Sequence, residues 1–308
     1  MGIDGLQGLN RFAFEPSTCP ICDSQDAQPR HKIKKYDQGE LTFMTCRQCG
    51  TVYQNPRPDQ ESLHGFYTSE NCFTSSGDEK KFVGWLDYDA EEPTRQKNAA
   101  YRLAETEALF PAGQKLKILK IACGYGTFIK QARDAGHDAT GIDFSEVMVA
   151  AAKERYDVAL IHANFLEHEF GDERYDVVLF YGAINNFQKP VDVGRKVLQV
   201  LKPGGYYLTN FVEPDSIIER VQGAGFWLYR PPVVGLWKAQ PFVDTHRELG
   251  FEQSQVRRDI QWAALKKLIG YLQVQPLIRL TRALGMEDIF LKLPTPGYKK
   301  IILRKPYA

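Results

Sequence analysis

Four of the six cysteines lie in two closely spaced pairs, and this spacing is typical of a metal site. The pairs are Cys19-Pro-Ile-Cys22 and Cys46-Arg-Gln-Cys49, and Gly50 follows the second. A C-x2-C turn lets two thiolates face one point, and two such turns complete a tetrahedron around zinc. Because four thiolates leave no open coordination position, the sequence predicts a structural zinc ion. Two disulfides or four unrelated thiols are the alternatives, and a reducing cytosol disfavours disulfides.

A second candidate site is a turn of small residues that follows an apolar segment. The turn consists of Ala122, Cys123, Gly124, Tyr125 and Gly126. Small residues let the backbone approach a ligand, and the helix expected next offers its positive end. Asp143 follows the next apolar segment and could accept hydrogen bonds from both hydroxyls of a ribose. The dinucleotide pattern G-x-G-x-x-G fails at Ile129, and no P-loop pattern is present.

Apolar segments alternate with helical patterns from residue 116 onward. Strands are expected at 117–122, 138–142, 158–161, 176–181 and 205–211, with helices at 127–135, 145–155 and 191–201. This alternation predicts an α/β fold with a doubly wound, mostly parallel sheet. Further expected elements are a helix over 94–109, a helix over 241–249, a helical block over 261–285 and a strand over 298–304.

These elements predict three regions. Residues 1–58 are expected to form a zinc ribbon, which ends at the two prolines Pro56 and Pro58. Residues 59–112 are expected to form a helical linker or lid. Residues 113–308 are expected to form the core, with a helical insertion at about 212–290.

Composition narrows the classes of function. The 308 residues are 43% hydrophobic and 25% charged, which is typical of a globular protein. A net charge of +1 disfavours nucleic acid as a partner. We expect no transmembrane segment, because the sequence has no run of about 18 apolar residues. A cytoplasmic location is therefore expected, and a homodimer is one of the oligomeric states left open.

In the order of its motifs, the chain resembles the class I S-adenosylmethionine-dependent methyltransferases. More narrowly, it resembles their bacterial branch with an N-terminal zinc ribbon, over nearly its whole length. The matching motifs are Cys46 to Pro58, Ile118 to Gly126, Gly141 to Ser145, Ala163 to Phe165, Tyr175 to Tyr181, Leu201 to Gly205, Gly250 to Glu252 and Ile301 to Lys305. The resemblance implies a Rossmann-like methyltransferase core with S-adenosylmethionine as cofactor.

The resemblance also assigns residues to the cofactor. They are Ala122, Cys123, Gly124, Gly126, Asp143, Phe144, Asn164, Phe165 and Phe180. The chain departs from the family pattern at four places. Lys120 stands where an acidic residue is usual, Ala122 where a glycine is usual, Asn164 where Asp is commoner, and Asn185-Asn186 where many relatives carry Glu-His.

The candidate catalytic residues are Tyr181, Asn185 and Asn186, at the carboxyl end of an expected strand. An amide can orient a hydroxyl acceptor but cannot take its proton, and a tyrosine of ordinary pKa near 10 is a poor base. His162 and Glu213 are the alternative bases. The segment Phe226 to Pro232 either covers the acceptor, through Tyr229 and Arg230, or packs in the core.

The sequence therefore predicts methyl transfer to a small polar acceptor. A hydroxyl of a sugar, nucleotide-sugar or natural product is favoured, in polysaccharide or natural-product biosynthesis, and a carbon acceptor is possible. Two alternatives remain: a protein of the same fold without transfer activity, and a zinc-ribbon methyltransferase of nucleic acid.

Overall fold

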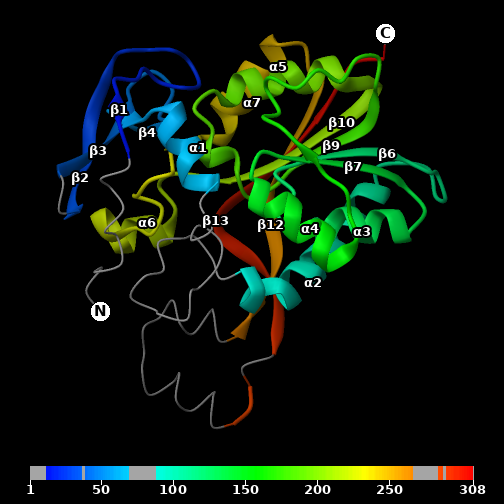
Figure 1. Ribbon diagram of the computed structural model, residues 1–308. Coiled ribbons are helices and arrows are strands. Elements are labelled where there is room, and N and C mark those ends of the chain that lie inside the picture. Colours follow the sequence, from blue (N-terminus) through cyan, green and yellow to red (C-terminus); the bar gives the residue numbers. More distant parts are fainter. Residues whose placement is uncertain (1–11, 37–38, 69–87, 266–283, 287–288, 308) are drawn as a thin grey trace.

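The structure, a computed structural model, describes residues 12–36, 39–68, 88–265, 284–286 and 289–307. Its centre is a seven-stranded sheet of strand order β12-β13-β10-β9-β6-β7-β8 (Figure 1). The strands are β6 (Lys117–Ile121), β7 (Asp138–Asp143), β8 (Ile161–His162), β9 (Tyr175–Phe180), β10 (Leu201–Val212), β12 (Gln253–Ala264) and β13 (Phe290–Arg304). All neighbouring pairs are parallel except those that β13 makes. The expected doubly wound, mostly parallel sheet is confirmed.

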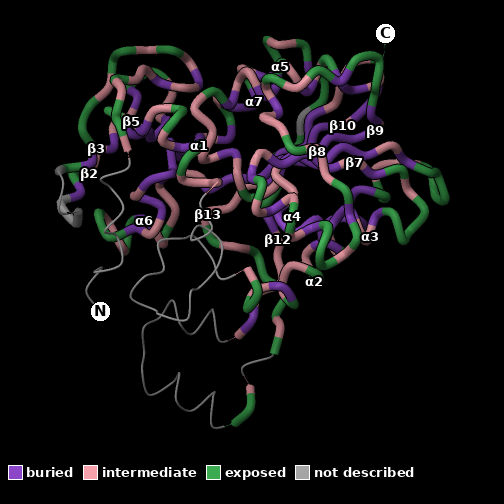
Figure 2. Tube along the Cα trace, viewed as in Figure 1, coloured by how far each residue is buried: buried purple, intermediate pink, exposed green. Residues whose placement is uncertain are grey.

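Helices cover both faces of this sheet. One face carries α2 (Tyr88–Glu107), α3 (Thr127–Asp134) and α4 (Glu146–Tyr156), and the other carries α5 (Pro190–Val200) and α7 (Ala239–Glu248) (Figure 1). Successive side chains of a strand point to opposite faces, so Ile118 packs toward α2 and α3 while Leu119 packs toward α5 and α7. Because both faces are covered, the central strands are buried along nearly their whole length (Figure 2).

The cysteine-containing region forms a second sheet of order β11-β4-β3-β2. Its strands are β2 (Ala27–Tyr36), β3 (Gly39–Cys46), β4 (Val52–Gln54) and β11 (Gly235–Leu236). Strand β11 comes from a distant part of the chain, yet Gly235 pairs with Tyr53. A short antiparallel pair, β1 (Phe14–Glu15) with β5 (Arg57–Pro58), precedes helix α1 (Gln60–Thr68).

The segment from Phe226 to Pro232 packs in the core between the two sheets. It follows α6 (Ile217–Gln222) and the short turn η4 (Gly223–Gly225). Phe226 and Tyr229 are buried, and the hydroxyl of Tyr229 donates to the buried carboxylate of Glu219. Arg30 of β2 also donates to Glu219, so this network connects the ribbon with the segment. Of the two interpretations of this segment, the structure supports packing.

The helical block expected over 261–285 is wrong at its start. Residues up to Ala264 belong to β12, where Gln261 pairs with Leu293 and Trp262 with Lys292 of β13. Pairing along this long hairpin overrides a helical pattern of apolar residues. Residues 266–283 lie outside the described residues. Among the helices that the structure does describe, none has the length and apolar character needed to cross a membrane.

Helices α5 and α7 meet at a glycine. A Cβ atom at Gly194 of α5 would overlap Nε2 of His246 in α7. The His246 ring is stacked on Phe242, and its Nδ1 lies 2.7 Å from the carbonyl oxygen of Phe242. Burial lowers the pKa of His246 to about 4, so the ring is neutral and serves as a packing group.

We predict that Gly194→Ala destabilises the protein by about 1–3 kcal/mol, because the methyl group overpacks the contact with His246. Gly65→Ala in α1 is the matched control, because a Cβ atom at Gly65 has nothing within 4 Å. That change should stabilise the helix by about 0.5–1 kcal/mol. Thermal unfolding of both variants checks the prediction, and equal shifts of the two midpoints would contradict it.

Candidate functional site

One buried carboxylate ties together the carboxyl ends of β6 and β7. Asp143 Oδ2 accepts a hydrogen bond from the backbone N–H of Gly124 at 2.9 Å, and Oδ1 accepts one from Ser145 at 3.0 Å. Burial raises the pKa of Asp143, while the two backbone N–H groups and Lys120 act in the opposite direction. A carboxylate has roughly four acceptor positions, so about two remain for hydroxyl groups of a ligand.

The turn over residues 122–126, here called the glycine turn, has a backbone that suits small residues. Ala122, Gly124 and Gly126 all have positive φ angles, of 55°, 55° and 75°. At Ala122, a residue with a Cβ, this conformation costs about 1–2 kcal/mol, which explains why a glycine is usual there. A Cβ atom at Gly124 would lie 2.8 Å from the ring of Tyr88. The Cys123 thiol donates to the carbonyl oxygen of Lys120 at 2.9 Å, so it points into the protein.

A pocket of about 510 Å³ lies beside Phe144, the residue that follows Asp143, and we call it the α1 pocket. It is lined by Gln60, Glu61 and His64 of α1 and by Phe144, His162, Ala163, Asn164 and Glu167. The volume lies within the range of small-molecule sites. Two of the predicted cofactor residues, Phe144 and Asn164, therefore face one pocket. No motif in the sequence indicated that α1 forms the opposite wall of this pocket.

The polar side chains of the α1 pocket hydrogen-bond to one another and to nearby backbone groups. Asn164 Nδ2 donates to Glu167 at 2.8 Å, and Asn164 Oδ1 accepts from the backbone N–H of Leu166 at 3.1 Å. His162 Nε2 lies 3.1 Å from the carbonyl oxygen of Phe144. These contacts place His162 beside the pocket, away from the residues that follow β9.

The remaining predicted cofactor residues, Phe165 and Phe180, lie in the core. Phe165 is 3% exposed and packs against Phe170, and Phe180 is fully buried against Phe187. The alternation of β9 points Phe180 toward α5 and α7, so its ring has no exposed surface for a ligand.

Asn185, one of three predicted catalytic residues, has both ends of its amide engaged. It lies in the short helix η3 (Ile184–Asn186). Its Nδ2 donates to the carbonyl oxygen of Gly235 at 2.7 Å, and its Oδ1 accepts from the backbone N–H of Val212 at 3.2 Å. These bonds join β11 to the end of β10. The side chain of the adjacent Asn186 makes no hydrogen bond within the described part of the chain.

Tyr181, the third predicted catalytic residue, follows β9 directly. The guanidinium of Arg102 lies 4.3 Å from the centre of its ring. Its hydroxyl is buried and has no hydrogen-bond partner within the described residues. Burial raises the pKa of Tyr181, so the hydroxyl stays protonated at neutral pH and can donate a hydrogen bond. Of the alternative bases, Glu213 accepts from the backbone N–H of Ala239 at 3.0 Å and so caps α7.

Buried charges on α2 form a network that sequence reasoning missed. Arg102 Nη2 donates to Asp259 of β12 at 2.7 Å, and Asp259 also accepts from Asn210 of β10 at 2.7 Å. Asn210 in turn accepts from the backbone N–H of Gly182 at 2.7 Å. One signal in the sequence pointed here: Arg102 stands beside the apolar Leu103 within the helix expected over 94–109.

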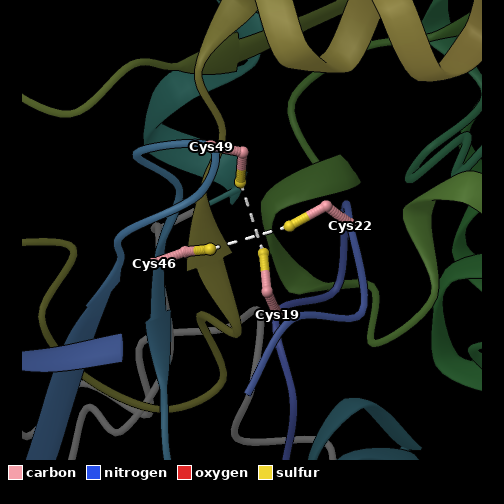
Figure 3. Close-up of side chains that lie close together, drawn as sticks. All are labelled: Cys19, Cys22, Cys46 and Cys49. Carbon is pink, nitrogen blue, oxygen red and sulfur yellow. Dashed lines mark hydrogen bonds between the residues drawn. The ribbon is translucent and has the colours of Figure 1, made fainter. Parts of the chain in front are cut away.

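The four paired cysteines converge on one point (Figure 3). All their Sγ atoms lie within 4.8 Å of one another; the pairs Cys19–Cys49 and Cys22–Cys46 are 3.5 and 3.6 Å apart. These distances are too long for disulfides, whose S–S bond is about 2.05 Å. They are close to the roughly 3.8 Å between ligands that tetrahedral zinc–sulfur bonds of about 2.3 Å imply. The donor set fits a closed zinc site.

Comparison with known proteins identifies the domain that contains the glycine turn. Residues 119–209 match the family model described as a methyltransferase domain. A demethylmenaquinone methyltransferase of Listeria welshimeri is 33% identical over 110 residues, which cover 33% of this chain and 47% of the relative. One of Bacillus mycoides is 28% identical over 157 residues, covering 48% and 66%. The chain thus spans about half the length of the Listeria relative.

Solved structures show the same fold. A S-adenosylmethionine-dependent methyltransferase from Archaeoglobus fulgidus superposes with a TM-score of 0.50 at 16% identity. The superposition covers 71% of this chain and 99% of that protein. It therefore extends beyond the segment that the family model matches.

We predict that Asn185→Ala lowers the free energy of unfolding by about 1–3 kcal/mol, because it leaves the polar groups of Gly235 and Val212 unpaired. Asn186→Ala should change it by less than about 0.5 kcal/mol. Thermal unfolding of the two variants distinguishes a structural Asn185 from the hypothesis that both amides orient an acceptor. Under that hypothesis both variants would unfold like the parent protein and differ from it in turnover alone.

Proposed function

We propose that this protein transfers a methyl group from S-adenosylmethionine to a small polar acceptor, because residues 119–209 match the model of a methyltransferase domain and lie in a mostly parallel sheet. One observation carries the proposal: Asp143, between the glycine turn and the α1 pocket, keeps about two acceptor positions beyond its backbone bonds. A ribose with two adjacent hydroxyls matches this arrangement.

The residues present fit three features of the cofactor: its ribose, its adenine and the close approach of the chain that it requires. Asp143 would hold the ribose, and the backbone of the glycine turn lets the chain pass close to a ligand. Phe144, Ala163 and Asn164 would enclose the adenine in the α1 pocket. When bound, S-adenosylmethionine supplies a methyl group on a positively charged sulfur, which is open to attack by a nucleophile.

Among the residues that the structure describes, Tyr181, Asn185 and Glu213 can position a substrate, but none of these three is available as a base. Tyr181 stays protonated, Asn185 binds backbone groups, and Glu213 caps α7. We therefore propose that Tyr181 donates a hydrogen bond to the acceptor. The acceptor then either loses its proton to water or enters already ionised.

A sugar, nucleotide-sugar or natural-product hydroxyl is the proposed acceptor, with carbon as the alternative atom. The Listeria relative is named for demethylmenaquinone, which supports a quinone-class molecule as a second candidate. For the cysteine cluster we propose one structural zinc ion, because four thiolates around one centre leave no position for a substrate.

We predict that Asp143→Asn lowers the affinity for S-adenosylhomocysteine at least tenfold. The change removes charge-assisted hydrogen bonds, each worth about 1.5–3 kcal/mol, and about 1.4 kcal/mol corresponds to a factor of ten. Calorimetric titration measures the affinity, and thermal unfolding without ligand checks that the variant is folded. Asp134→Asn is the control, since Asp134 is exposed and pairs with Lys130 on α3. A folded Asp143→Asn variant with unchanged affinity would refute the assignment.

We predict one zinc ion per chain by elemental analysis of the purified protein. Cys46→Ser should lose the metal and lower the thermal midpoint, because metal binding and folding of such a ribbon are coupled. Cys123→Ser is the matched control and should keep the metal, since Cys123 lies outside the cluster. Metal-free parent protein with four reactive thiols would exclude the zinc site.

A further inference from the structure

Asp259 is a buried carboxylate at an irregular point in the pairing of β12 with β13. Arg258 pairs with Lys299 and Ile260 with Pro294, so the register shifts at Asp259. The preceding Arg258 is exposed, whereas Asp259 has no exposed surface. Irregularities of this kind change the direction of a side chain and are common next to active sites. Strand β12 thus directs one carboxylate inward, where it meets α2.

Three side chains donate hydrogen bonds to this carboxylate. Its Oδ2 accepts from Nη2 of Arg102 at 2.7 Å, from Nδ2 of Asn210 at 2.7 Å and from Nε2 of Gln261 at 2.6 Å. Nη1 of Arg102 lies 2.6 Å from the other oxygen, Oδ1. A buried ion pair is often no more stable than apolar side chains of similar volume, because both charges lose their hydration. Stability alone is therefore a weak reason for this pair.

Two of these three partners of Asp259 also contact Tyr181 or the peptide that follows it. The guanidinium of Arg102 lies 4.3 Å from the centre of the Tyr181 ring. Oδ1 of Asn210 accepts from the backbone N–H of Gly182 at 2.7 Å. Tyr181 is thus held at its ring and at the next peptide, by two side chains that both bind Asp259. Because Asp259 pairs with Arg102, that cation is engaged within the protein and serves the ring.

We propose that Asp259 is a positioning residue, which acts through Arg102 and Asn210 to hold the Tyr181 side chain in one orientation. This inference rests on the proposed function, in which the hydroxyl of Tyr181 donates to the acceptor. That hydroxyl makes no hydrogen bond within the described residues, so no bond of its own fixes its direction. Its direction depends on the ring and the backbone, and a misplacement of about 1 Å can slow a reaction roughly 100-fold.

The first measurement tests the contact that runs through Arg102. NMR of protein labelled with carbon-13 at the Cζ atoms of its tyrosines reports on each ring, and the signal that Tyr181→Phe removes belongs to Tyr181. We expect one Tyr181 signal in the parent protein. Asp259→Asn removes the charge and keeps the shape, so Arg102 loses its ion pair and the Tyr181 signal should shift or split. A folded Asp259→Asn variant with the parent signal overturns the proposal.

The second measurement tests the contact that runs through Asn210, and it stands even if Asp259→Asn does not fold. The double variant Arg102→Met, Asp259→Leu replaces both charges by apolar groups and should unfold at about the parent temperature. Hydrogen exchange at the N–H of Gly182 should nevertheless become at least tenfold faster, because Asn210 has lost its anchor. If the double variant recovers both the stability and the slow exchange at Gly182, the network is only structural and the proposal is overturned.

Gly194→Ala is the control for a general loss of stability. It is expected to lower the thermal midpoint, but it lies on α5, on the other face of the sheet. The Tyr181 signal and the exchange at Gly182 should therefore stay as in the parent protein. Changes in Gly194→Ala equal to those in the Asp259 variants would overturn the proposal.

These outcomes are separable from a failure of the proposed function. S-adenosylhomocysteine should bind the parent and both Asp259 variants with affinities within twofold of one another. A tenfold loss in the variants would assign the network to the cofactor and overturn the proposal. Parent protein that does not bind this nucleoside removes the proposed function, and the two measurements on ligand-free protein still decide whether Asp259 positions Tyr181.

Discussion

A single side-chain amide, that of Asn185, connects the two sheets of the molecule. Its NH2 group binds the carbonyl oxygen of Gly235 in β11, and its oxygen binds the N–H of Val212 at the end of β10. Its own carbonyl oxygen accepts from Val234. Because β11 completes the ribbon's sheet, these bonds fix the ribbon against the carboxyl edge of the core. Helix α1 directly follows the ribbon, so the same bonds set one wall of the α1 pocket.

Helix α2 lies beside the glycine turn, where Tyr88 is close to Gly124, and polar contacts fix the helix along its length. Near its start, Glu92 accepts from Thr127 at the first turn of α3, and farther on Asn98 exchanges two hydrogen bonds with the backbone of Trp262. Arg102 then binds Asp259. Both α1 and α2 lie outside the segment that matches the methyltransferase family model. The match to the family model therefore leaves out both helices, and their contribution to the candidate site must be argued from this chain.

The sequence was informative where chemistry is local. The alternation of apolar segments placed the parallel strands β6, β7, β9 and β10 but missed β12, and the cysteine spacing predicted the cluster, because these signals depend on neighbouring residues. It was uninformative where partners are distant: Asn185 binds a residue 50 positions away, and Arg102 one 157 positions away. A residue's place in a family motif also does not show which way its side chain points. Phe180 matches a family motif, yet the alternation of β9 turns it into the core.

The late position of β11 in the chain has a consequence for how the protein is made. Strand β4 ends at Gln54 and β11 begins at Gly235, so 235 − 54 = 181 positions separate them. At a synthesis rate of about 5–20 residues per second, the ribosome needs roughly 10–40 seconds to cover that distance. During this interval the edge of β4, which β11 later pairs with, is open to pairing with other chains. The ribbon, which leaves the ribosome before the core, is thus completed only after Gly235 has emerged.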